Sequence, residues 1–147
     1  MKKRMLIALA LAATTVLAPA HARDTAVNIR LADVLDMPEA KTKLDGSVQF
    51  FLAGQTTPKV AKKFNEDVTN PKTNAFGKSD DVSCKWVILS ALISLQGTAK
   101  EKGANAVIGI TSYYKKNETI SDTTVECHAG GLMSGVALKG TYATVEK

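Results

Sequence analysis

The sequence has few of the residues that build reactive sites. Its 147 residues include two cysteines, two histidines and one tryptophan. Glycine-rich phosphate-binding loops, the G-x-S-x-G elbow and the H-E-x-x-H zinc motif are all absent. His128 is the only histidine after the N-terminal segment, so a Ser-His-Asp triad would have to use it. We therefore expect a protein that is not an enzyme and that has no cofactor.

Long hydrophobic runs are also missing, and the one at the N-terminus is short. Met-Lys-Lys-Arg is followed by an apolar run from Met5 to Leu17 and then by Ala18-Pro19-Ala20-His21-Ala22. The run has about a dozen residues, whereas a membrane span needs about 20. The pattern predicts a signal peptide over residues 1–22, cleaved between Ala22 and Arg23. We expect the product in the periplasm, with no membrane span in its mature form; a retained N-terminal anchor is the alternative.

Neither sign of charge dominates the mature part. Three of the 19 basic residues belong to the predicted signal, which leaves 16 basic against 14 acidic residues. The signs alternate along the chain, whereas a protein that binds nucleic acid would carry a basic patch. We therefore expect no nucleic-acid partner.

The remaining patterns predict an α+β fold. We divide the mature chain into an N-terminal segment, 23–46, with one short helix that ends near Leu44, and a single domain, 47–147. The strongest element is a helix over about 80–102, with Ser79 as its N-cap and Gly103 after its end. Strand patterns cover 47–52, 59–69, 104–113, 120–126 and 136–145. The expected architecture is a small, mostly antiparallel sheet packed on the one long helix.

Two details of this architecture matter below. One apolar stripe of the long helix comprises Val82, Trp86, Leu89 and Ile93, and a neighbouring stripe comprises Ile88, Leu92, Leu95 and Ala99. We expect Trp86 to be largely buried, with exposure in a functional patch as the alternative. The glycine-rich segment from Ala129 to Gly135 fits either a hairpin turn or a bulged strand.

The two cysteines, Cys84 and Cys127, are expected to form a disulfide. The helix and the strand after it are of similar length and run antiparallel, so the chain returns to the end of the helix that holds Cys84. An exported domain with two cysteines most often pairs them. The alternative is a soft-metal site for copper or zinc, formed by Cys84, Cys127, His128 and Met133. It lacks a C-x-x-C spacing, and adjacent strand residues such as Cys127 and His128 point apart.

Several motifs occur in a familiar order. Cys84 near a helix start is followed by Gly103-Ala104-Asn105-Ala106-Val107-Ile108, then Cys127, then Met133-Ser134-Gly135-Val136-Ala137-Leu138. This pattern resembles the periplasmic domain of the RcsF family and, more distantly, the YbjQ-type domains. The resemblance implies a small sheet with a principal helix, held by the Cys84–Cys127 disulfide. It also implies protein interaction or envelope sensing, with a protein partner in the cell envelope.

The chain departs from the RcsF pattern at a second disulfide, whose positions fall near Ser112 and Met133, and it lacks the lipid-bearing cysteine. Over nearly the whole mature chain it is similar to small exported proteins labelled excinuclease ATPase subunit. That label conflicts with the residues, because phosphate-binding loops and zinc-finger cysteines are absent. The ligand or partner, the signal sensed and the oligomeric state are left open.

Overall fold

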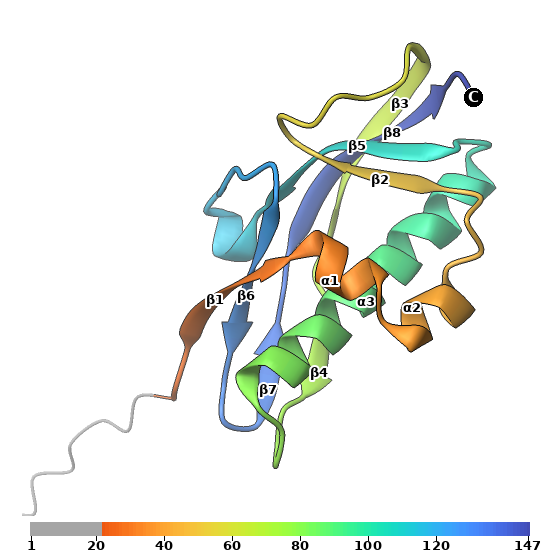
Figure 1. Cartoon of the computed structure of the whole chain (residues 1–147). Helices are drawn as coiled ribbons and strands as arrows, with labels where there is room; N and C mark the ends of the chain where they lie inside the picture. Colours follow the sequence, from red (N-terminus) through yellow and green to blue (C-terminus); the bar gives the residue numbers. More distant parts are fainter. Residues whose placement is uncertain (1–21) are drawn as a thin grey trace, which may run out of the picture.

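The computed structural model describes residues 22–147, so the predicted signal peptide lies outside the described residues except for Ala22. The fold is α+β, as expected, with one long helix and two four-stranded sheets. Its elements, shown in Figure 1, are β1 (Thr25–Arg30), α1 (Leu31–Leu35), α2 (Pro38–Lys43), β2 (Gln49–Leu52), β3 (Val60–Thr69), β4 (Lys72–Asn74), α3 (Asp80–Glu101), β5 (Ala106–Ser112), the 3₁₀ turn η1 (Tyr114–Lys116), β6 (Thr124–Ala129), β7 (Met133–Gly135) and β8 (Leu138–Val145).

The expected single sheet is in fact two sheets. One has the order β1-β6-β7-β4, and all of its neighbouring strands are antiparallel. The other has the order β2-β5-β8-β3, in which β2 and β5 run parallel and the other pairs are antiparallel. The chain passes between the two sheets several times, and two of these connections are only two residues long: 70–71 between β3 and β4, and 136–137 between β7 and β8. The prediction of mostly antiparallel strand pairing is therefore confirmed, and the parallel pair of β2 with β5 is the exception.

The N-terminal segment is more ordered than its weak pattern indicates. Besides the expected short helix, found as α2, it contains a strand and a further short helix, α1. β1 pairs with β6 along its whole length, from Thr25 opposite Ala129 to Arg30 opposite Thr124. Figure 1 shows the segment crossing the molecule from the edge of one sheet to the edge of the other. It therefore joins both sheets.

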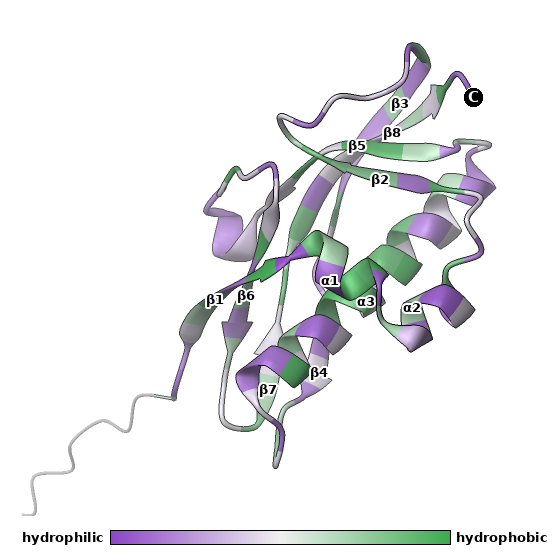
Figure 2. Cartoon of the chain, viewed as in Figure 1, coloured by the Kyte–Doolittle hydropathy of each residue, from purple (hydrophilic) through white to green (hydrophobic). Residues whose placement is uncertain are grey.

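α3 is the core helix of the molecule. Ser79 caps its start, since the side chain accepts a hydrogen bond from the Val82 N–H at 3.2 Å. α3 packs against strands of both sheets. Among residues 22–147 it alone has the length and apolar composition of a membrane span, and more than half of that stretch is buried inside the domain. Figure 2 shows that the part of α3 beside α1 is hydrophobic.

The buried face of α3 agrees with the prediction in part. Val82 is 43% exposed, and Trp86 and Ile93 are only half-buried at the margin of the core. Trp86 therefore packs against the core, as expected, but is not among its fully buried residues. All four residues of the second stripe are fully buried, as are Leu89 of the first stripe and four residues that belong to neither stripe: Ser83, Cys84, Val87 and Ala91.

The segment from Ala129 to Gly135 is a hairpin turn. His128 pairs with Gly135 and Ala129 with Ser134, in antiparallel register. The Gly130 N–H donates to the Met133 carbonyl at 2.9 Å and closes the turn. A Cβ at residue 130 would lie 2.4 Å from that carbonyl oxygen, so the turn requires glycine at this position.

Candidate functional site

The expected disulfide is present. Cys84 in the second turn of α3 is bonded to Cys127 in β6, with the two Cα atoms 5.8 Å apart and both side chains fully buried. The bond fastens the start of α3 to the sheet that contains β1 and β6. Because both sulfur atoms belong to this bond, neither Cys84 nor Cys127 is free to bind a metal ion as a thiolate.

The remaining residues of the soft-metal alternative lie apart from the disulfide. His128 follows Cys127 in β6 and points to the opposite side of the strand, as side-chain alternation requires. Met133, half exposed at the start of β7, lines the same cavity as His128. Within residues 22–147, no group of three or more His, Cys, Asp or Glu side chains is placed to hold a metal ion.

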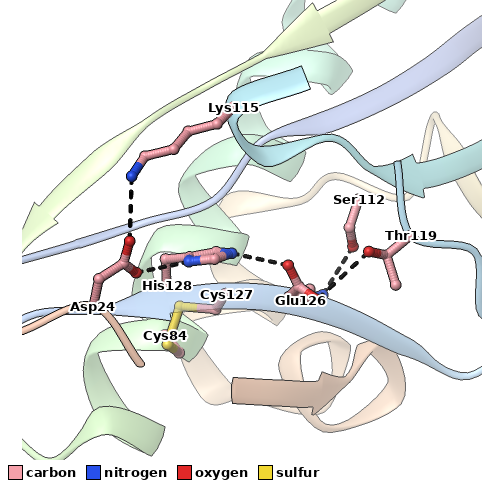
Figure 3. Close-up of polar contacts among 8 residues, drawn as sticks. All are labelled: Asp24, Cys84, Ser112, Lys115, Thr119, Glu126, Cys127 and His128. Atoms are coloured by element: carbon pink, nitrogen blue, oxygen red, sulfur yellow. Dashed lines mark hydrogen bonds and ion pairs between the residues drawn. A yellow bond between two sulfur atoms is a disulfide. The ribbon is translucent and has the colours of Figure 1, made fainter. Parts of the chain in front are cut away.

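His128 is the centre of a polar cluster that the sequence does not predict (Figure 3). Its ring stacks on Tyr114, with the ring centres 3.7 Å apart. Nδ1 lies 2.7 Å from Asp24 Oδ1, and Nε2 lies 2.8 Å from Glu126 Oε1. An ionised carboxylate only accepts hydrogen bonds, so both ring nitrogens donate only when the imidazole carries both protons. Each ring nitrogen of His128 is thus placed against a carboxylate oxygen.

The carboxylates of the cluster are themselves held by other elements. Lys115 Nζ in η1 lies 3.3 Å from Asp24 Oδ2. The hydrogen bond with His128, supported by Lys115, holds the pKa of Asp24 below its ordinary value. On the other side, Thr119 Oγ1 donates to Glu126 Oε2 at 3.5 Å, and Ser112 Oγ accepts from the Glu126 backbone N–H at 2.8 Å. The network thus connects the start of β1, β6 and η1.

This cluster is suited to holding the fold rather than to catalysis. Both ring nitrogens of His128 are already engaged by carboxylates, and no hydroxyl or amine among the described residues is hydrogen-bonded to either. A general base needs a free acceptor nitrogen facing a proton to be removed. The adjoining cavity, of about 320 Å³, is lined by Asp24 and His128 of the cluster and by Ser134, whose hydroxyl is hydrogen-bonded to that of Ser83.

A second feature is a groove along the outer edge of β2, which we call the edge groove. Three adjoining cavities of about 500, 430 and 330 Å³ form it. The first and second share Gly46 and Gln49, and the second and third share Leu35 and Phe50, so the three cavities are neighbours in a row. Leu35 of α1 and Ala40 and Lys41 of α2 line the central cavity together with residues of β2. Figure 1 shows α1 and α2 on the same side of β2.

The groove follows an open sheet edge. β2 is the outermost strand of its sheet and pairs only with β5. Phe50 and Phe51 are neighbours and point to opposite faces of the strand, yet both line the central cavity, so that cavity lies at the strand's edge. Gln55 already covers part of this edge, because its Oε1 accepts from the Leu52 N–H at 2.8 Å. The backbone of Phe50 faces outward beside it.

The groove is apolar in the middle and polar at both ends. Lys41 is the only charged residue that lines the central cavity, and no carboxylate in residues 22–147 forms an ion pair with it. Arg30 and Asp122 line one end, and Glu146 and Lys147 line the other. Sequence reasoning missed this site. The one local signal was the pair Phe50-Phe51, because two adjacent aromatic residues cannot both face one core from a strand.

Comparison with known proteins adds no relative to this picture. No protein-family model matches the chain, and no match was found among curated proteins. The likeness to the RcsF family therefore stays a resemblance of sequence patterns. The function has to be argued from the surfaces described above.

Proposed function

We propose that the chain is an exported, non-enzymatic domain of the cell envelope that binds a protein partner through the edge groove. The groove is the observation that carries this proposal. It is a long depression with an apolar centre, set against the unpaired edge of a sheet. Proteins that recognise extended peptides use this combination, because the strand edge supplies backbone hydrogen bonds and the pockets select side chains.

The chemistry of the groove defines the segment that fits it. Half-buried Leu35, Leu44 and Phe50 offer apolar contacts along its centre. Lys41 at the rim favours an acidic residue in the ligand. The expected ligand is therefore an extended protein segment with alternate apolar side chains and one acidic residue opposite Lys41. The outward N–H and carbonyl of Phe50 are the groups with which its backbone would pair.

Selection from a random peptide library displayed on phage tests the proposal. Peptides with apolar and acidic residues should be enriched, and fluorescence anisotropy with the synthetic peptides gives their affinities. Lys41→Glu should weaken binding about tenfold or more, since it places like charges together. Lys63→Glu is the matched control, because Lys63 is equally exposed on β3 and lines none of the three cavities.

A photo-crosslinking amino acid in place of Gln49 gives an independent readout, since Gln49 is exposed and lines two of the three cavities. The selected peptide should crosslink at position 49 and not at position 63. Equal binding by the Lys41 and Lys63 variants, or crosslinking only at position 63, would contradict the proposal. Binding of fatty acids without any peptide would assign the groove to a small amphiphile instead.

Export is the other part of the proposal. The apolar run and Ala20-His21-Ala22 support cleavage before Arg23. N-terminal sequencing of the protein from the periplasm of the native host should therefore begin at Arg23. An intact Met1 on soluble protein would contradict the cleavage, and recovery from the cytoplasm alone would contradict the location.

A further inference from the structure

Exposed apolar side chains gather at one end of the molecule, away from the edge groove. Six large hydrophobic residues are exposed among residues 22–147, and four of them lie at this end. We call these four the apolar tip: Phe76, Val82, Leu132 and Met133. The Ala75 N–H donates to the Leu132 carbonyl at 2.8 Å, so the two loops that carry the tip lie side by side. Figure 1 shows both loops projecting at the end where the chain enters the domain.

Hydrogen bonds within the turns hold the tip residues in exposed positions. The Phe76 N–H donates to Asn74 Oδ1 at 2.9 Å, and the Lys78 N–H donates to the Ala75 carbonyl at 3.0 Å. Gly77 has a φ of +70°, which a turn of this kind needs at its third residue. Phe76 therefore stands at the corner of a fixed turn and is 74% exposed. Leu132, at 68%, stands in the same way on the tight β6–β7 hairpin.

The charges around the tip are positive in balance. Asp80 is paired with Arg23 at 2.8 Å and Asp81 with Lys85 at 2.9 Å. Lys72 and Lys78 form no ion pair within residues 22–147. The acidic groups of this end are thus neutralised, whereas two exposed ammonium groups are not.

The chain enters the domain at the tip. Ala22 and Arg23 line a cavity of about 400 Å³ together with Leu132 and Met133. The apolar run Met5–Leu17 precedes this point by only a few residues of sequence. A chain still attached to a membrane by that run would therefore hold this end of the domain close to the lipid surface.

We propose that the apolar tip binds the surface of a membrane that contains anionic phospholipids. Protruding apolar side chains on separate turns enter the soft interface of a bilayer, whereas a rigid partner would need a pocket for each. The unpaired Lys72 and Lys78 match anionic headgroups, which attract basic residues next to an inserted apolar group. The contact is peripheral and adds no membrane span.

Co-sedimentation with lipid vesicles tests this. Protein recovered from the periplasm should bind vesicles of phosphatidylethanolamine and phosphatidylglycerol, and should bind phosphatidylcholine vesicles much less. Phe76→Ser/Leu132→Ser should lower the fraction bound about tenfold or more, because apolar insertion is lost. Lys72→Ala/Lys78→Ala should lower it too and should remove most of its dependence on salt.

The matched control is Val68→Ser/Ile120→Ser, which changes two exposed apolar residues outside the tip. All variants should keep the urea midpoint of the wild type, because the altered side chains are exposed. The proposal fails if the wild type does not bind anionic vesicles, or if the control loses as much binding as the tip variant. It also fails if sedimentation shows that the wild type and the control form a dimer and the tip variant does not, since the tip would then bind a second copy. Peptide binding at the edge groove is a separate measurement and does not depend on this result.

Discussion

The side-chain amide of Asn105 forms hydrogen bonds with both the N–H and the carbonyl of Val145. Its Oδ1 accepts from the Val145 N–H at 2.8 Å, and its Nδ2 donates to the Val145 carbonyl at 2.9 Å. The Asn105 carbonyl also accepts from the Gln49 N–H at 3.0 Å. One residue thus joins the start of β2 to the end of β8. This is the asparagine of the Ala-Asn-Ala-Val motif, whose role in the described fold is structural.

Asn105→Ala should therefore lower the free energy of unfolding by about 1–3 kcal/mol, since partly buried backbone groups lose their partners. Urea denaturation measures the change. Asn117→Ala is the control, because Asn117 is exposed and only its backbone forms a hydrogen bond. Equal effects of the two substitutions would show that the amide contacts contribute little.

The buried face of α3 gives a second prediction. Leu92 is fully buried, whereas Val82 is 43% exposed on the same helix. Leu92→Ala should cost about 2–5 kcal/mol of unfolding free energy because it leaves a cavity. Val82→Ala should change it by less than about 0.5 kcal/mol. If Val82→Ala lowered the urea midpoint more than Leu92→Ala, the stripe through Val82 and Trp86 would be the packed face of the helix.

The disulfide gives a third prediction. Cys84 and Cys127 are 43 positions apart, so the bond restricts a long loop of the unfolded chain. Reduction should lower the free energy of unfolding by about 2–4 kcal/mol. In Cys84→Ala/Cys127→Ala the same loss should appear without reductant, and reductant should add nothing. Native protein should contain no free thiol by alkylation and mass spectrometry; two free thiols would argue against the bond.

The fourth prediction concerns pH. The pKa of Asp24 is lowered in the folded state by its hydrogen bond with His128. A lowered pKa adds stability that is complete above the ordinary value of 3.8 and is lost as the pH falls through the folded value. Asp24→Asn should therefore lower the urea midpoint near pH 6, and its difference from the wild type should shrink in stronger acid.

Asp36→Asn is the control for this series, because Asp36 is exposed and forms no ion pair among residues 22–147. Its urea midpoint should differ from that of the wild type by a constant amount across the range. A difference between Asp24→Asn and the wild type that stayed constant into strong acid would show that the ion pair does not contribute.

The elements with strong local signals were predictable from the sequence. Ser79 with the acidic residues after it marks the start of α3, and alternation marks β3 within one residue. The pairing of Cys84 with Cys127 could be predicted because the strand after the helix runs antiparallel to it and brings the chain back to the end of the helix that holds Cys84. The short β1 was missed because Ile29 is its only buried residue, which leaves almost no alternation to detect.

The buried face of α3 was only partly predictable because apolar residues surround much of the helix. The predicted stripe of Ile88, Leu92, Leu95 and Ala99 is fully buried, but Ser83 and Ala91, which belong to neither stripe, are fully buried too. Small side chains let neighbouring elements approach closely, and a hydrophobic pattern does not detect that. The edge groove and the His128 cluster depend on contacts between distant segments, such as Asp24 with His128, which no local pattern contains.

The pairing of β1 with β6 has a consequence for the order in which the chain can fold. Thr25 lies opposite Ala129, so β1 can pair only after β6 has been synthesised, more than a hundred residues later. Contacts of such long range slow folding, because the loop must close before the contact stabilises it. A growing chain therefore lacks this sheet until nearly all of it has been made. Until then β1 has no partner strand in this sheet, because it is an edge strand and pairs only with β6.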